Sequence, residues 1–203
     1  MHDNGGAAMD KARLEAFSDG VIAVIITIMV LELKVPRGAR LEDLVELVPV
    51  FFSYVLSYLY VGIYWNNHHH MLHTVRRVTG GILWANLHLL FWLSLIPFTT
   101  AWMAENRFAT WPTFAYGLAL LLSAIAYYGL QTSMIRRDGP QSLLAKAIGS
   151  DLKGKISPAL YLSAMALGFV ATWMALAVYV AVALIWLVPD RRIERLIGGP
   201  PAD

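Results

Sequence analysis

The sequence RLEAFSDGVIAVIITIMVLELKVP, residues 13–36, decides the fold of this chain. Within it, every residue from 21 to 31 is apolar except Thr27, and Pro36 follows as a stop signal. An apolar stretch of this length predicts a helix from Lys11 to about Lys34 that crosses a membrane. Polar residues stand near its beginning, and they need partners there because an unpaired charge in lipid is unfavourable.

The composition of the whole chain is that of a membrane protein. Of its 203 residues, 58% are hydrophobic and 15% are charged, whereas a soluble domain has about 25% charged residues. The net charge of +2 is too small to indicate nucleic-acid binding, and the absence of cysteine excludes disulfides and thiol catalysis. We therefore expect an all-α, polytopic membrane protein.

Three further apolar segments predict one crossing each, and a fourth predicts two. The three are Leu41–His70, Ile82–Met103 and Trp111–Ile135. The fourth, residues 156–188, carries no charge, and its 33 residues exceed the length of one crossing, which is about 20 residues. We expect two short helices here that turn near Gly168 and residues 169–173, which makes about six transmembrane helices in all.

The distribution of basic residues orients these helices. With both termini inside, the cytoplasmic segments hold 12 of the 16 Lys and Arg residues, which is the distribution that the positive-inside rule favours. We expect a disordered N-terminus at residues 1–10, a six-helix transmembrane domain at 11–189 and a cytosolic tail at 190–203. The expected location is the cell (plasma) membrane, with both termini cytoplasmic.

Polar side chains on three of the helices are expected at the same cytosolic depth. Asp19 needs a donor near the membrane edge, and the candidates are His68–His70, His73, Asn86 and His88. Such a polar layer either anchors the first helix or, because histidine titrates near neutral pH, acts as a gate or proton sensor. Consecutive histidines point around a helix and do not converge on a metal, and no catalytic set is present, so we expect neither metal, cofactor nor enzyme.

One face of the first helix carries Val24, Thr27, Ile28 and Leu31, which are three and four residues apart. An ordinary membrane helix shows the same pattern, and a lone threonine in it bonds to its own i−4 carbonyl. The periodicity therefore permits an ion pathway along this face without establishing one.

Three segments of the chain resemble the transmembrane protein 175 family of lysosomal and prokaryotic potassium channels. The first is the pattern R-x3-FSDG-V-x-A-x3-T-x3-LE-x3-P, which begins at Arg13 and ends at Pro36. The others are WNNHHHMLHTV from Trp65 and LWANLHLLFWLSLIPFTT from Leu83. The resemblance covers about the first 110 residues, and the rest of the chain matches only in hydropathy.

The resemblance implies a six-helix subunit of the one-repeat prokaryotic type that assembles as a homotetramer in the lipid bilayer. Its first helix would line a central pore for permeating K⁺, with hydrophobic rings at Val24, Ile28 and Leu31 and a polar ring at Thr27. The candidate network that holds or gates this helix comprises Arg13, Phe17, Ser18, Asp19, His69, His70, His73, Asn86 and His88.

The implied function is passive, potassium-selective cation conduction. Two alternatives stay open at this point. One is a proton-conducting or pH-gated channel that uses the layer of His residues and Asp19. The other is a non-conducting membrane assembly protein in which the same layer is purely structural.

Overall fold

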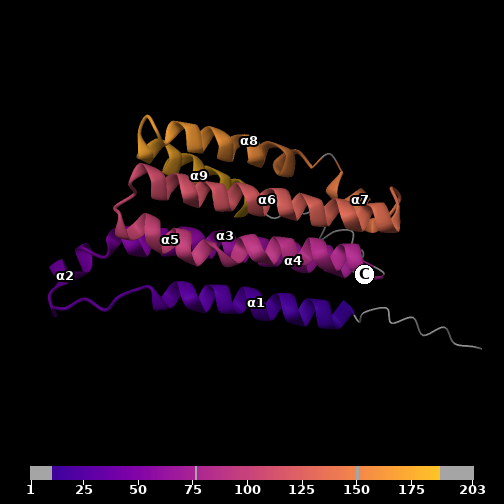
Figure 1. The fold of residues 1–203 in the computed structure, drawn as a ribbon, viewed down its shortest axis with the longest axis horizontal. Helices are drawn as coiled ribbons and strands as arrows, with labels where there is room; N and C mark the ends of the chain where they lie inside the picture. The colour runs from indigo at the N-terminus through magenta and orange to yellow at the C-terminus, as the bar shows by residue number, and fades with distance from the viewer. Residues whose placement is uncertain (1–10, 76, 150, 188–203) are drawn as a thin grey trace, which may run out of the picture.

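The computed structural model describes residues 11–75, 77–149 and 151–187, and these residues form helices and no strand (Figure 1). The all-α prediction is therefore confirmed for this part of the chain. The predicted termini, residues 1–10 and 190–203, lie outside it. The helices are α1 (Lys11–Leu31), α2 (Leu41–Val45), α3 (Val48–Thr74), α4 (Gly80–Ser94), α5 (Ile96–Glu105), α6 (Thr110–Asp138), α7 (Leu143–Ile148), α8 (Leu152–Leu167) and α9 (Thr172–Leu187).

Four of these segments are long and apolar enough to cross a membrane: α1, α3, α4 together with α5, and α6. The helices α8 and α9 have 16 residues each and form the predicted hairpin, with Gly168 as the C-cap of α8. The hairpin packs tightly on α6. A Cβ atom added at Gly117 of α6 would lie 2.0 Å from the hydroxyl oxygen of Tyr179 of α9, which leaves no room for a side chain there. The hairpin itself is confirmed, whereas six crossings and a tetramer stay predictions.

Two helices that the sequence predicts as continuous are interrupted, and a proline explains each break. The segment from Leu41 divides into α2 and α3 because Pro49 has no N–H and its ring collides with the carbonyl four residues earlier. Pro97 has the same effect between α4 and α5, where the Leu95 N–H bonds to the Trp92 carbonyl at 3.2 Å, three residues back. The four-residue spacing of an α-helix is lost at both points.

Other boundaries differ from the prediction by a few residues. The first helix ends at Leu31 and not at Lys34, since the Leu33 N–H closes a tighter turn on the Val30 carbonyl at 3.1 Å. The polar connection after α6 contains the short helix α7, which the sequence reasoning missed. Gly139 and Gly149 follow α6 and α7 with φ values of 88° and 56°, a conformation that favours glycine.

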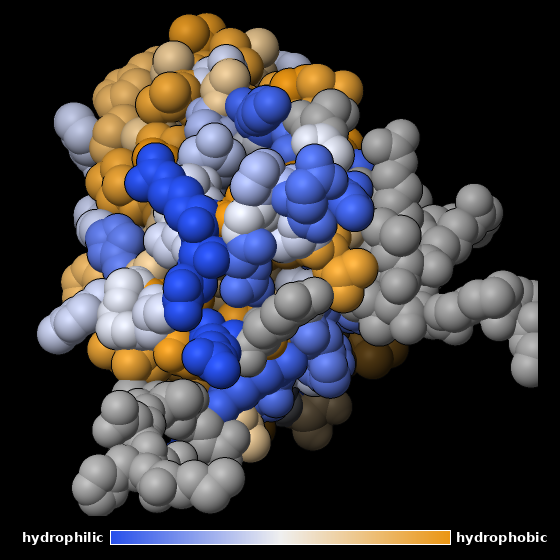
Figure 2. All heavy atoms as spheres, turned by 90° about the vertical axis from the view of Figure 1, so that its right-hand side faces the viewer, coloured by the Kyte–Doolittle hydropathy of each residue, from blue (hydrophilic) through white to orange (hydrophobic). Residues whose placement is uncertain are grey.

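The helix α1 lies at one edge of the bundle and the α8–α9 hairpin at the opposite edge (Figure 1). It packs against α3, α4 and α5, whereas α8 packs against α6 and α9. At one end of the molecule α1 and α4 begin, α3 and α6 end, and hydrophilic side chains gather (Figure 2). The described basic residues of the segments predicted to be cytoplasmic belong to this end: Lys11, Arg13, Arg77, Arg136, Arg137, Lys146, Lys153 and Lys155.

Candidate functional site

The helix α1 has one face buried in the bundle and one face open. The buried face presents five side chains at intervals of three and four residues, each at most 4% exposed: Leu14, Ser18, Ile22, Ile25 and Met29. On the open face Val24 is 55% exposed, Ile28 43% and Leu31 79%. Phe17 lies seven residues before Val24 on the same face and is also exposed. The predicted stripe is therefore the side of α1 that no other described helix covers.

Thr27 lies on this open face with its hydroxyl group already bonded on one side. Its Oγ1 donates to the Val24 carbonyl at 2.8 Å, three residues back and not the four that we expected. The single hydroxyl proton is thereby used, and the oxygen keeps its acceptor lone pairs. An exposed oxygen of this kind accepts a hydrogen bond or coordinates a cation.

A buried chain of hydrogen bonds joins α1 to α4 and α3 on the other face. The Asn86 Nδ2 donates to Ser18 Oγ at 3.0 Å, and the Asn86 Oδ1 lies 2.6 Å from His68 Nε2. Ser18 Oγ in turn donates to the Leu14 carbonyl at 2.8 Å. All three side chains are at most 2% exposed. Since the Asn86 oxygen is an acceptor, His68 carries its proton on Nε2.

The direction of these bonds favours the anchoring role of the polar layer, while its role as a gate or proton sensor stays a prediction. Each donor points toward α1, and the chain ends on the backbone carbonyl of Leu14. The amide of Asn86 stands in the middle and does not exchange protons at neutral pH as an imidazole does. The arrangement therefore holds helices together and forms no continuous proton relay.

Asp19 finds its donor outside the residues that we expected. The Trp65 Nε1 donates to Asp19 Oδ1 at 2.9 Å, and Trp65 was not among the expected donors. The Trp65 ring stacks on His69 with 5.9 Å between ring centroids. The indole N–H is a donor only, and a search limited to histidine and amide donors overlooked it. A carboxylate in the first half of one helix and a tryptophan in the second half of the next were the signal that the sequence carried.

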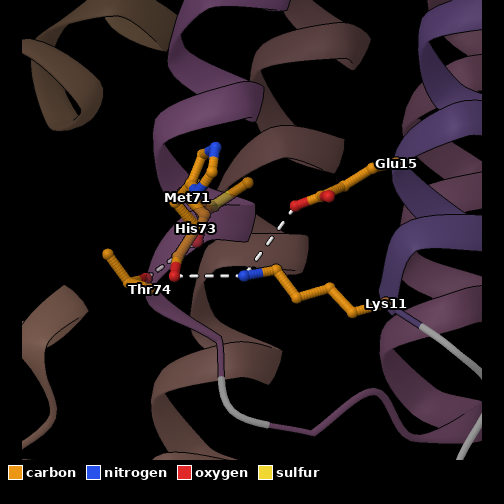
Figure 3. A network of polar contacts seen from close by, with 5 residues as sticks. All are labelled: Lys11, Glu15, Met71, His73 and Thr74. Carbon is orange, nitrogen blue, oxygen red and sulfur yellow. Dashed lines mark hydrogen bonds and ion pairs between the residues drawn. The ribbon is translucent and has the colours of Figure 1, made fainter.

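At the hydrophilic end, Lys11 attaches the first turn of α1 to α3 (Figure 3). Its Nζ donates to the backbone carbonyl of His73 at 3.1 Å and lies 3.8 Å from a carboxylate oxygen of Glu15. The imidazole of His73 instead contacts His69, with 4.4 Å between ring centroids. His73 thus belongs to the attachment of α1 through its main chain, which the sequence reasoning did not foresee.

Among the remaining members of the predicted network, the ring of His70 contacts that of His69, with 5.6 Å between the ring centroids. Arg13 and Phe17 are exposed, and His70 is half-buried on α3. His88 is exposed and accepts a hydrogen bond from Trp92 Nε1 at 3.3 Å on its own helix, so it does not contact α1 through that bond. Residue His68, which the predicted network did not retain, is the histidine that joins the buried chain.

Metal-ligating side chains do not gather in the described part of the chain. Among residues 11–75, 77–149 and 151–187, no group of three or more His, Asp or Glu is close enough to hold an ion. The expectation that the protein needs no metal stays a prediction.

At the opposite end of α1, an ion pair between Lys34 and Glu105 connects the following loop to α5. The Glu105 carboxylate, through its hydrogen bond and its charge, raises the pKa of Lys34 above the ordinary value of 10.5. Both side chains are exposed, so the pair is a weak surface contact.

Comparison with known proteins places this arrangement in a family. A sequence profile described as the endosomal/lysosomal potassium channel TMEM175 matches residues 13–97. A potassium channel of Chryseobacterium sp. (strain P1-3) is 54% identical over 187 residues, which are 92% of this chain and 97% of the relative. The chain belongs to the TMEM175 family. It is therefore a multi-pass membrane protein of a channel family, and the recognition made from the FSD motif is confirmed.

Two other members extend the comparison. The crystal structure of a lysosomal potassium-selective channel TMEM175 homolog from Chamaesiphon minutus superposes with a TM-score of 0.78 at 29% identity, over 89% of this chain and 97% of that one. The endosomal/lysosomal proton channel TMEM175 of Bos taurus is 35% identical over 83 residues, which are 35% of this chain and 17% of the bovine protein. A family of channels is consistent with the expectation that this protein is not an enzyme.

Proposed function

We propose that this protein is a potassium-selective cation channel of the cell membrane, formed by four copies with α1 of each copy facing a central pore. The observation that carries the proposal is the open face of α1, where the apolar side chains of Val24, Ile28 and Leu31 are exposed in the described part of the chain. In a soluble protein such a face would be covered, and in a single subunit within a membrane it would meet lipid. Four copies around an axis turn it into the wall of a pathway.

The three apolar positions would act as rings that control wetting of the pore. They are four and three residues apart, so on a helix they stand about 6 Å and 4.5 Å apart along the axis. A narrow pathway between rings of Val24, Ile28 and Leu31 side chains expels water when it closes. A small outward tilt of α1 would widen all three rings and admit hydrated ions.

Potassium selectivity would follow from the cost of partial dehydration at these rings. A sodium ion holds its water more tightly than potassium, so a narrow apolar ring excludes sodium more strongly. The Thr27 oxygen lies between Val24 and Ile28 with its proton donated to the backbone, and four such oxygens would return part of the lost coordination. Only moderate discrimination is expected, since the pathway has few fixed dipoles. No cofactor takes part in this mechanism.

Ion flux from purified protein in liposomes tests the proposal. Vesicles loaded with K⁺ and diluted into K⁺-free buffer should take up protons in the presence of a protonophore as K⁺ leaves, and Na⁺-loaded vesicles should do so more slowly. Light scattering combined with size-exclusion chromatography should give the mass of a tetramer in detergent. Tetramers without flux above that of empty vesicles would contradict the channel, and a monomer without flux would favour the non-conducting assembly protein.

A proton-conducting channel is the second candidate, because relatives such as the bovine protein are named proton channels. The same vesicles, with a pH gradient and no K⁺, separate the two functions. The directional chain through Asn86 favours potassium, since it supplies no proton relay to the open face of α1. A proton current without the K⁺ flux would reverse this preference.

A further inference from the structure

A second feature lies away from α1, on the other side of the bundle. Helices α3, α6, α8 and α9 enclose a cavity of about 40 Å³ that opens near the hydrophilic end of the molecule. Several water molecules fit in this volume, since one water needs roughly 10–15 Å³ of such space. Six aromatic side chains dominate the lining: Tyr60, Tyr64, Tyr127, Tyr128, Tyr161 and Trp186.

Hydrogen bonds and ring contacts hold these aromatic side chains in place. Tyr60 donates its hydroxyl proton to the Tyr179 carbonyl at 2.6 Å, and Trp186 Nε1 donates to Ser157 Oγ at 2.8 Å. The rings of Tyr60 and Tyr161 have centroids 6.3 Å apart, and those of Tyr64 and Tyr127 are 6.0 Å apart in an edge-to-face arrangement. The walls of the cavity are therefore preorganised aromatic surfaces.

One carboxylate stands at the polar side of this cavity. Asp151 caps the N-terminus of α8 from a left-handed backbone conformation with φ of 41°. Its two oxygens accept from the Gly154 N–H at 3.1 Å and from Gln131 Nε2 at 3.0 Å. Both of these donors are neutral. The backbone N–H groups in the first turn of α8 offset only part of the negative charge of Asp151.

The cavity combines an aromatic lining with a carboxylate whose charge is only partly offset. This combination favours one class of ligand. Aromatic faces attract cations electrostatically, and methylated ammonium groups are recognised in this way because they have no proton to donate. A divalent metal cation is bound mainly by several carboxylate and carbonyl oxygens, and Asp151 is the one carboxylate among the described lining residues. A methylated ammonium presents methyl groups to its surroundings, and aromatic rings contact these without hydrogen bonds.

We propose that the cavity between α3, α6, α8 and α9 binds a quaternary ammonium group, with the aromatic side chains as its cage and Asp151 as its counter-charge. The group has two possible sources, a phosphatidylcholine headgroup or a free choline-like solute. The site involves no residue of α1, so the inference does not depend on the proposed pore.

Calorimetric titration of the purified protein tests this inference. The probe is choline, added to protein in a maltoside detergent, and the matched control is 3,3-dimethyl-1-butanol, which has the same shape without the charge. Choline should bind and the neutral analogue should bind about tenfold more weakly or not at all. Equal binding of the two, or no binding of choline to folded protein, would overturn the proposal.

Variants separate the cage from the counter-charge. Asp151→Asn keeps an acceptor and a helix cap but removes the charge, and it should weaken choline binding. Tyr127→Leu should weaken it, whereas Tyr127→Phe keeps the ring and should preserve it. Tyr58→Leu, at an exposed position of α3 outside the cavity, is the control. Unchanged binding in both Asp151→Asn and Tyr127→Leu, at melting temperatures equal to wild type, would contradict the assignment.

The source of the group follows from the lipid environment. In nanodiscs of phosphatidylcholine, added choline should bind more weakly than in nanodiscs of phosphatidylglycerol if headgroups occupy the cavity. Equal affinity in both lipids assigns the site to a free solute.

Discussion

The two halves of α1 are attached to the bundle by different kinds of contact. Residues 11–19 make polar contacts to neighbouring helices through Lys11, Ser18 and Asp19. Residues 21–31 pack only through apolar side chains, and their single side-chain hydrogen bond, from Thr27, stays within the helix.

This difference matters because the surrounding medium is lipid. Hydrocarbon tails are as apolar as a leucine side chain, so apolar packing alone holds two membrane helices together weakly. A buried hydrogen bond has no replacement in lipid, and breaking it leaves polar groups unpaired. The first half of α1 is therefore its fixed end, and the second half is the part that can tilt.

Replacing Asn86 should lower the melting temperature more than any other change proposed below, because it removes the hydrogen bonds that join the first half of α1 to the bundle. Asn86→Leu leaves His68 and Ser18 buried without their bonds to the amide, which should cost about 2–4 kcal/mol. We expect a lower melting temperature and loss of flux. Thermal unfolding in detergent measures the first quantity.

The matched control on the same helix is Ser94→Ala. It removes a hydroxyl that donates only to the Phe91 carbonyl at an exposed position. Equal melting temperatures of Asn86→Leu and Ser94→Ala would show that the buried chain contributes little.

Adjacent residues in the second half of α1 provide the next comparison. Leu31 and Val30 are both exposed, at 79% and 44%, but they are about 100° apart around the helix. Leu31→Asn should increase K⁺ flux several-fold, since a polar ring wets more readily, and Val30→Asn should leave it near the wild-type rate. If Leu31→Asn and Val30→Asn changed the K⁺ flux equally, the proposal that the open face of α1 lines the pore would be contradicted.

Thr27 should have a smaller effect, confined to selectivity. Thr27→Val keeps the shape and removes the oxygen, so the ratio of K⁺ to Na⁺ flux should fall by a few-fold. Thr27→Ser keeps the oxygen and should preserve the ratio. Parallel flux measurements in the two salts provide the test, and an unchanged ratio in Thr27→Val would exclude coordination by this hydroxyl.

The smallest effect on stability is expected from the ion pair of Lys34 with Glu105, which follows the end of α1 that lies away from Lys11. The pKa of Lys34 is raised above 10.5, so its contribution is fully present below that pH and is lost only as the pH rises through the higher value. The melting temperature of Lys34→Gln should therefore differ little from wild type and keep the same difference from pH 7 to 10. A difference that changes within this range would contradict the exposed geometry.

Much of the fold was predictable because hydropathy and helix length leave few alternatives in a membrane. The helix within residues 11–31 and the hairpin at Gly168 follow directly from these patterns. The breaks at Pro49 and Pro97 were missed, although the missing N–H of proline explains both after the fact.

From the sequence, the exposed side of α1 was easier to predict than the residues that its polar side chains contact. Periodicity places Val24 and Leu31 on one side of the helix, and the family resemblance singles out this side. Which donor reaches Asp19 depends on how two helices are rotated and shifted against each other. A sequence without that information lists histidines and overlooks Trp65.

The buried bond between Ser18 and Asn86 also sets the depth at which α1 enters the bundle. An apolar helix has many nearly equivalent positions along its axis, because one leucine replaces another against the same neighbour. Sliding α1 by one turn, about 5.4 Å, would place Leu14 or Ile22 opposite Asn86 and leave the amide without its acceptor. The buried bond therefore favours one register of α1, because a rotation of this helix about Ser18 keeps the bond whereas a sliding movement along its axis breaks it.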